Sequence, residues 1–179
     1  AAQALEGWLE DDPGAAPLHF LLAAAYQRAG NTALARASLE AAHAADEAYV
    51  PARVMMARMA LRNYDDALYR LHRDYLREQI PDASELKILE AEAAALSGDA
   101  GAALALLESA YRVQPNTRTL LAYAEQLWRQ DQSDDARALL EDWLTEWPDD
   151  AMARGALSDL LAQAGETDAQ LKAYRDILA

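Results

Sequence analysis

The stretch LEDWLTEWPDD at residues 140–150 has a counterpart near the start of the chain, LEGWLEDDPGA at residues 5–15. Trp143 corresponds to Trp8 and Pro148 to Pro13, and each pair is 135 residues apart. In both stretches an apolar helix end and a tryptophan precede a proline, which disfavours helix at the residue before it. Recurrence of the whole pattern at a fixed distance indicates an internal repeat.

The spacing of the prolines gives the period of this repeat. Pro13, Pro81, Pro115 and Pro148 are 68, 34 and 33 residues apart, and Glu47 stands where one proline is missing. The distance of 135 residues is therefore four repeats of about 34. Short polar turns are predicted halfway between these marks, at Gly30-Asn31, Arg62-Asn63, Gly98-Asp99, Asp131-Gln132 and Gly165-Glu166.

Each period is long enough for two amphipathic helices, here called helix A and helix B. In the third repeat, residues 84–96 are predicted as helix A and residues 102–113 as helix B, joined by SGDAG. Apolar and small residues recur at intervals of three and four within each helix. Gly98 permits the turn and Asp99 can cap helix B. The second repeat departs, with a turn about two residues short and a correspondingly long helix B at residues 64–78.

Composition supports an all-α fold and restricts the partners. The 179 residues are 53% hydrophobic, and roughly a quarter are alanine, the strongest helix former. The net charge of −14 argues against binding nucleic acid or an anionic membrane surface. The chain has no cysteine, and no apolar run is long enough to span a bilayer.

These features resemble the tetratricopeptide repeat family over the whole chain. The family's small eighth position matches Ala23, Ala57, Ala91, Ala124 and Ser158. Its alanine at position twenty matches Ala35, Ala67, Ala103 and Ala136, and Gln170 departs. Leu39, Leu107, Leu140 and Tyr174 are expected to fill the space between helices. Glu90 occupies a position that is usually apolar, which leaves the register of helix 84–96 open by one residue.

The resemblance implies a right-handed α-solenoid formed by one array over residues 1–179. A lone helix at residues 1–11 is expected to precede five helix pairs that start near residues 16, 50, 84, 117 and 151. Such repeats bury their apolar faces only by stacking. The chain is interpreted as a piece of a longer repeat protein, with exposed apolar surface at both ends and a tendency to associate end to end.

The resemblance also implies a concave groove built from the A helices. Carrying over the family's groove positions gives these candidate partner-binding residues: Phe20, Arg58, Arg62, Glu92, Leu121, Glu125, Trp128 and Asp159. The family's carboxylate clamp for a peptide C-terminus is not reproduced. An extended partner with basic residues and an apolar anchor suits this set better, although all of them can equally be ordinary solvated helix residues. Trp128 either lines the groove or packs against the neighbouring repeat.

No residue pattern in the chain points to catalysis. His19, His43 and His72 lie in different predicted helices without a carboxylate at metal-ligand spacing, and are interpreted as solvated or structural. SGDAG is a repeat turn rather than a nucleotide-binding loop. The acidic run at residues 131–150 lacks the spacing of a calcium loop. We therefore expect no catalytic, metal or cofactor site.

The predicted function is a non-catalytic scaffold for protein–protein interaction. The junction sequences resemble long bacterial arrays, among them the tetratricopeptide lipoproteins of exosortase and exopolysaccharide systems. This resemblance implies a periplasmic or envelope location; otherwise the chain is expected to be cytoplasmic. Two alternatives stay open: a docking region of a larger enzyme such as a glycosyltransferase, and carbohydrate binding through Trp128 and the groove carboxylates.

Overall fold

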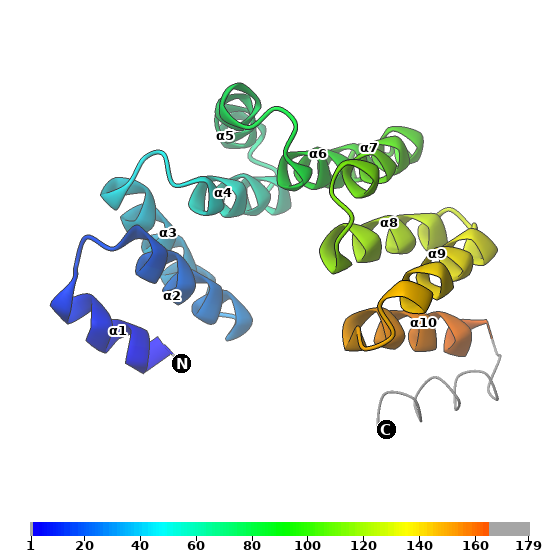
Figure 1. Cartoon of the computed structure of the whole chain (residues 1–179). Coiled ribbons are helices and arrows are strands. Elements are labelled where there is room, and N and C mark those ends of the chain that lie inside the picture. The colour runs from blue at the N-terminus through cyan, green and yellow to red at the C-terminus, as the bar shows by residue number, and fades with distance from the viewer. Residues whose placement is uncertain (1, 165–179) are drawn as a thin grey trace. The chain divides into compact units, whose positions relative to one another are not determined.

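The computed structural model describes residues 2–164, and all regular structure in this range is helical. Helix α1 covers Ala2–Asp11 and is followed, in the described residues, by four helix pairs and by α10 (Figure 1). The A helices are α2 (Ala16–Arg28), α4 (Val50–Arg62), α6 (Ser84–Leu96), α8 (Thr117–Arg129) and α10 (Ala151–Gln163). The B helices are α3 (Thr32–Ala45), α5 (Asp66–Gln79), α7 (Ala100–Val113) and α9 (Ser133–Glu146).

The repeat is more regular in the structure than in the sequence. Every A helix has 13 residues and every B helix has 14. The five predicted pair starts coincide with the first residues of α2, α4, α6, α8 and α10. The all-α repeat fold is therefore confirmed. The predicted turn at Gly165-Glu166 and the expectations for Gln170, Tyr174 and the closing helix lie outside the described residues.

The chain divides into two compact units. Unit 1 comprises Ala1–Pro81 and unit 2 comprises Asp82–Ala179. In unit 1, each helix from α1 to α5 packs on the next one along the chain. In unit 2, sequential packing from α6 to α10 is joined by contacts of α8 with both α6 and α10. Packing between consecutive helices is what makes repeats depend on their neighbours for stability. The single array over residues 1–179 stays a prediction.

The turns within the four complete pairs share one conformation. Three residues separate helix A from helix B, and the middle one adopts positive φ: Gly30 (75°), Tyr64 (56°), Gly98 (81°) and Asp131 (59°). Glycine takes this left-handed conformation without the steric cost that a Cβ atom brings. The next residue caps helix B in three of the four turns, as when Asp99 accepts a hydrogen bond from the Ala102 amide at 2.9 Å.

The turn of the second repeat corrects the prediction made for it. It is not short, and α5 is not long, because Tyr64 occupies the left-handed position that glycine holds in two other repeats. Asp65 then caps α5 by accepting a hydrogen bond from the Leu68 amide at 3.0 Å. A tyrosine at this position gave no turn signal. The predicted turn at Arg62-Asn63 was therefore two residues too early.

The interior follows the small-residue pattern with one exception. All five residues at the small A-helix position are buried: Ala23, Ala57, Ala91, Ala124 and Ser158. Ala35, Ala103, Ala136, Leu39, Leu107 and Leu140 are also buried, as expected. The prediction for Ala67 was wrong, because the two-residue error in the turn carried into the helix. Ala67 is exposed, and Tyr69 is the buried residue at that position of α5.

The doubt raised by Glu90 is also resolved. Leu86, Leu89 and Ala91 are almost fully buried in α6, so the register of this helix is the expected one. Glu90 itself is half-buried. A long acidic side chain at the edge of a buried face can keep its carboxylate near water while its methylene groups pack.

Candidate functional site

Four of the eight candidate residues meet in one groove of unit 2. Leu121, Glu125 and Trp128 come from α8, and Asp159 comes from α10. The groove has a volume of about 300 Å³. Its remaining lining residues are Ala124, Leu140, Ala156, Leu160 and Gln163. We call this feature the α8–α10 groove.

The groove is positioned by the start of α8 and by the packing of α8 on α10. Asn116 and Thr119 form a reciprocal capping box, in which each side chain bonds the other residue's backbone amide, at 3.0 and 3.1 Å. The small residues Ala124 and Ser158 are buried at matching positions of the two helices. The side chains at positions 121, 125 and 128 lie on one side of α8 because they are three or four residues apart.

Trp128 has both of the roles that the sequence left open as alternatives. Its side chain is half-buried and packs against the core cluster that includes Leu127, Leu140 and Leu160. It also lines the groove. An indole held on one side by a packed core and open on the other loses little conformational freedom when a ligand covers it. Such aromatic side chains are frequent energetic anchors of interfaces.

Carboxylates supply the charge of the groove. Glu125 and Asp159 are both exposed, and within residues 2–164 no lysine or arginine lines the groove. Glu125 pairs with Arg129 at 2.6 Å, but both side chains are more than 60% exposed. An exposed pair of this kind contributes about 0–1 kcal/mol and exchanges readily. A basic group of a ligand can therefore replace Arg129 without a large cost.

The other four candidate residues lie outside this groove. Phe20 is in α2 of unit 1, where its ring meets Tyr49 edge-on at 5.9 Å and packs against a buried cluster that includes Ala23. Arg58 and Arg62 are on α4, half-buried and exposed respectively. Glu92 is half-buried on α6. Of the eight candidate residues, the structure therefore brings together only the four on α8 and α10, which are apolar or acidic.

One polar and aromatic network at the α9–α10 junction was not predicted. The side chain of Asp150 accepts hydrogen bonds from the Thr117 hydroxyl at 2.6 Å and the Trp143 indole N–H at 2.9 Å. It also caps α10 through the amides of Met152 and Ala153. Burial, the largest single influence, raises the pKa of Asp150, but these hydrogen bonds together outweigh it and lower the pKa.

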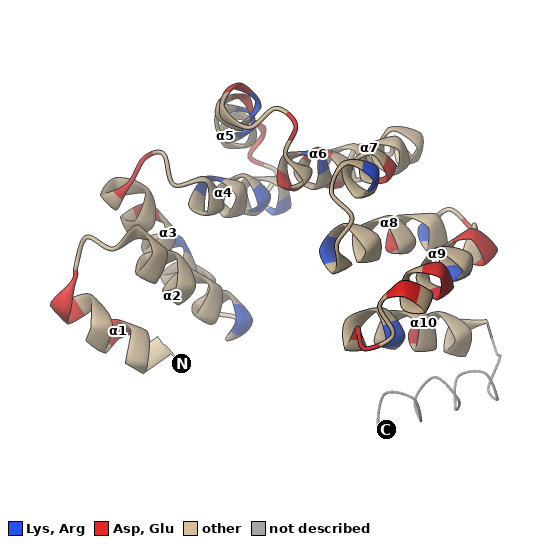
Figure 2. Cartoon of the chain, viewed as in Figure 1, with Lys and Arg blue, Asp and Glu red and all other residues tan. Residues whose placement is uncertain are grey.

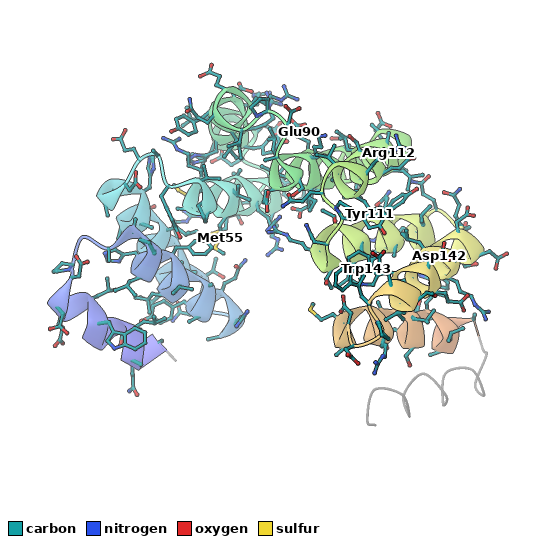
Figure 3. All side chains as sticks on the ribbon, in the orientation of Figure 1. Met55, Glu90, Tyr111, Arg112, Asp142 and Trp143 are labelled. Atoms are coloured by element: carbon teal, nitrogen blue, oxygen red, sulfur yellow. The ribbon has the colours of Figure 1, made fainter. Side chains whose placement is uncertain are left out.

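Aromatic rings continue from this junction into α7 and α8. The ring centroids of Trp143 and Tyr111, both labelled in Figure 3, lie 6.3 Å apart. Those of Tyr111 and Tyr123 lie 6.2 Å apart. Burial, followed by the negative charges of Glu146 and Asp142, raises the pKa of Tyr111. The recurrent WL…P motif marked this junction in the sequence, but nothing in it indicated that the indole would bond a helix-capping carboxylate.

A second unpredicted cluster joins three helices of unit 1. His43 of α3 and His72 of α5 meet edge-on with ring centroids 6.2 Å apart. Beside them Arg53 of α4 is buried, donates to the Glu47 carbonyl at 2.6 Å and stacks on Tyr75 at 3.6 Å. Burial first, then the charges of Arg53 and His43, lowers the pKa of His72 to about 4. This placement fits the structural role expected for these two histidines.

Residues 2–164 contain no group of three histidine, aspartate or glutamate side chains able to hold a metal ion. In the same range, no helix is both long enough and apolar enough to cross a bilayer. Acidic residues are frequent on α9, whereas α4 carries basic ones (Figure 2). Acidic and basic residues are therefore unevenly distributed over the described helices.

Comparison with known families agrees with the fold. Two profiles, each described as "Tetratricopeptide repeat", match residues 117–160 and residues 16–41 and 85–109, more than half of the chain together. The chain belongs to the tetratricopeptide repeat family. This fold generally mediates protein–protein interaction, and its members are typically non-catalytic scaffolds.

Solved structures of the family superpose over most of the chain. Yeast Tom70 is 17% identical with a TM-score of 0.74, over 98% of this chain and 38% of Tom70. A tetratricopeptide repeat protein of Thermus thermophilus is 22% identical with a TM-score of 0.72, over 92% of this chain and 90% of its own. Pseudomonas aeruginosa pilF is 15% identical with a TM-score of 0.63, over 91% and 75%. No curated protein sequence matches the chain.

Proposed function

We propose that the chain is an interaction scaffold that binds an extended segment of a partner protein in the α8–α10 groove. One observation carries the proposal: the groove joins an apolar floor, a half-buried indole and two exposed carboxylates. An apolar side chain of the partner covers Trp128 and Leu121. A lysine or arginine nearby in the partner pairs with Glu125 or Asp159.

The charge of the groove favours this class of partner over others. Binding an acidic segment would bring like charges together next to Glu125 and Asp159, which costs free energy. A purely apolar segment would leave both carboxylates partly desolvated and unpaired. A segment with alternating apolar and basic residues avoids both costs. It also associates faster at low ionic strength, because the protein carries a net charge of −14.

The proposal is tested by selecting binders from a displayed library of random 12-residue peptides and measuring their affinity by calorimetry. We expect the selected peptides to share an apolar and a basic residue, and Trp128→Ala to weaken binding at least tenfold. Asp159→Lys should weaken it by a similar factor, because it reverses a charge on the rim. Glu40→Lys, an exposed change on α3 of unit 1, is the matched control and should leave affinity unchanged. Equal affinity for the native chain and Trp128→Ala would refute the groove.

The wider setting of this scaffold rests on the resemblance to bacterial arrays. We propose a place in an envelope, exopolysaccharide or protein-sorting system, with a docking region of a larger enzyme as the alternative. Sequencing the gene on both sides separates the two. Further repeats and a lipoprotein signal support the scaffold, whereas an adjoining catalytic domain supports the enzyme.

A further inference from the structure

Two tryptophans at the end of α9 form a surface that is separate from the α8–α10 groove. Trp143 and Trp147 lie 5.9 Å apart with ring planes inclined by 32°. Trp143 is half-buried, whereas Trp147 is 53% exposed. Together with Thr117, Glu146, Pro148, Asp149 and Asp150 they line a hollow of about 470 Å³. None of these residues lines the α8–α10 groove.

The hollow is rigid on the side that faces the protein. Asp150 is held by Thr117, by the Trp143 indole and by two backbone amides of α10, so its carboxylate is fully engaged. Trp143 also packs against the core cluster of unit 2. The backbone amide of Trp147 donates to the Trp143 carbonyl at 2.8 Å, which holds the exposed indole close to the fixed one. A ligand therefore meets an aromatic surface that is already in place.

The outer side of the hollow is acidic. Glu146 is exposed, and the side chain of Asp149 is completely exposed. Arg154 reaches Asp149 at 3.5 Å, but its guanidinium also donates to the Pro148 carbonyl, so this cation is shared and lies outside the lining residues. Asp142 adds a further negative charge on the same helix (Figure 3). The hollow thus offers an aromatic face with negative charge beside it.

An aromatic face with carboxylates at its edge matches the chemistry of a guanidinium group. Tryptophan is the side chain that attracts a cation most strongly over its ring. Guanidinium is planar and weakly hydrated, so it stacks on an indole and pairs with carboxylates in the same pose. Ammonium holds its water more tightly and has no flat face to stack. An apolar ligand would cover Trp147 but leave Glu146 without a partner.

We propose that this hollow, the α9–α10 tryptophan site, binds an arginine side chain of a partner protein by stacking on Trp147 and pairing with Glu146 and Asp149. The site adds a second point of attachment to the α8–α10 groove and does not depend on it. A partner that occupies both gains affinity through effective concentration rather than through a stronger single contact.

The test uses the indole N–H signals of the four tryptophans in a ¹⁵N-labelled protein. The probe is N-acetyl-arginine methylamide, and N-acetyl-citrulline methylamide is the uncharged probe of the same shape. Trp147→Phe assigns the Trp147 signal. We expect saturable shifts of the Trp147 and Trp143 signals with the arginine probe, and none with citrulline. The lysine analogue should bind at least threefold more weakly.

Substitutions test whether the named residues bind the arginine probe. Glu146→Gln combined with Asp149→Asn should raise the dissociation constant at least threefold, and Trp147→Ala should abolish the saturable shift of Trp143. Asp134→Asn is the matched control, because it removes an exposed carboxylate about 18 Å away along the same helix and should change nothing. Circular dichroism checks that each variant is folded.

Three results would overturn the proposal. Equal shifts with citrulline would show that charge is not recognised, and equal affinity for lysine would remove the assignment to arginine. Shifts confined to Trp128 would place the cation in the α8–α10 groove instead. Because Trp128 reports on that groove separately, failure of the tryptophan site is distinguishable from failure of the proposed function.

Discussion

The histidine cluster of unit 1 should make the attachment of α5 sensitive to acid. Both ring nitrogens of His72 are buried and have no hydrogen-bond partner in the part of the chain that the structure describes, and His72 is only 2% exposed. Protonation would place a second cation beside buried Arg53 and next to His43. Burial first, and then these two neighbours, lowers the pKa of His72 to about 4 in the folded protein.

The sign and size of the effect follow from linkage. An unfolded histidine has a pKa of about 6.5, so between about pH 6.5 and pH 4 the unfolded chain binds more protons than the folded one. The stability contributed by neutral His72 is therefore complete above about pH 6.5 and is lost as the pH falls towards 4. The full difference corresponds to about 3 kcal/mol, and most of it is lost by pH 4.5.

Native-state hydrogen exchange of α5 amides measures this loss directly, because it reports the free energy of local opening. We compare the native chain with His72→Leu at about pH 7 and pH 4.5, after correction for the chemical exchange rate. The variant cannot titrate at this position, so on going from about pH 7 to pH 4.5 its opening free energy should fall about 2 kcal/mol less than that of the native chain. Carboxylate protonation affects both chains and cancels in the difference. A difference below about 0.5 kcal/mol would refute the reasoning, because a lowered pKa of His72 in the folded protein must appear as a loss of stability at low pH.

Four further outcomes are expected. Asp150→Ala should destabilise unit 2 by about 2 kcal/mol in urea unfolding, since it removes a helix cap and two side-chain hydrogen bonds, whereas Asp150→Asn should lose less. Gly98→Ala should lower the free energy of unfolding by about 1 kcal/mol, because Gly98 has a positive φ. Tyr64→Gly should raise it by about 0.5 kcal/mol, because Tyr64 also has a positive φ, is 84% exposed and packs on little. Leu107→Ala should cost about 2–5 kcal/mol, and an unchanged melting curve would contradict its buried placement. Trp8 is 58% exposed on α1, so light scattering at high concentration should detect self-association, and Trp8→Ala should reduce it; a strict monomer would contradict this.

The prediction for the second repeat was only partly correct, and its error shows which turns can be located from local residue preferences. Glycine and aspartate mark the other turns because their backbone preferences are local and independent of the fold. Tyr64 has no such preference, and the surrounding helices impose its left-handed conformation. The position of Ala67 was misjudged for the same reason, because each helical register was counted from the turn before it.

The sequence alone determined the period, the helix pairs and the small buried residues, since these depend on helical periodicity and on steric limits that recur every 34 residues or so. Only the tertiary structure decided which side chains meet. Leu121, Trp128 and Asp159 share a groove because α8 packs on α10. His43 contacts His72 of a different helix, and Trp143 donates a hydrogen bond to Asp150 across a turn. Such contacts depend on how each helix is rotated about its own axis, and that rotation is set by packing rather than by any local signal.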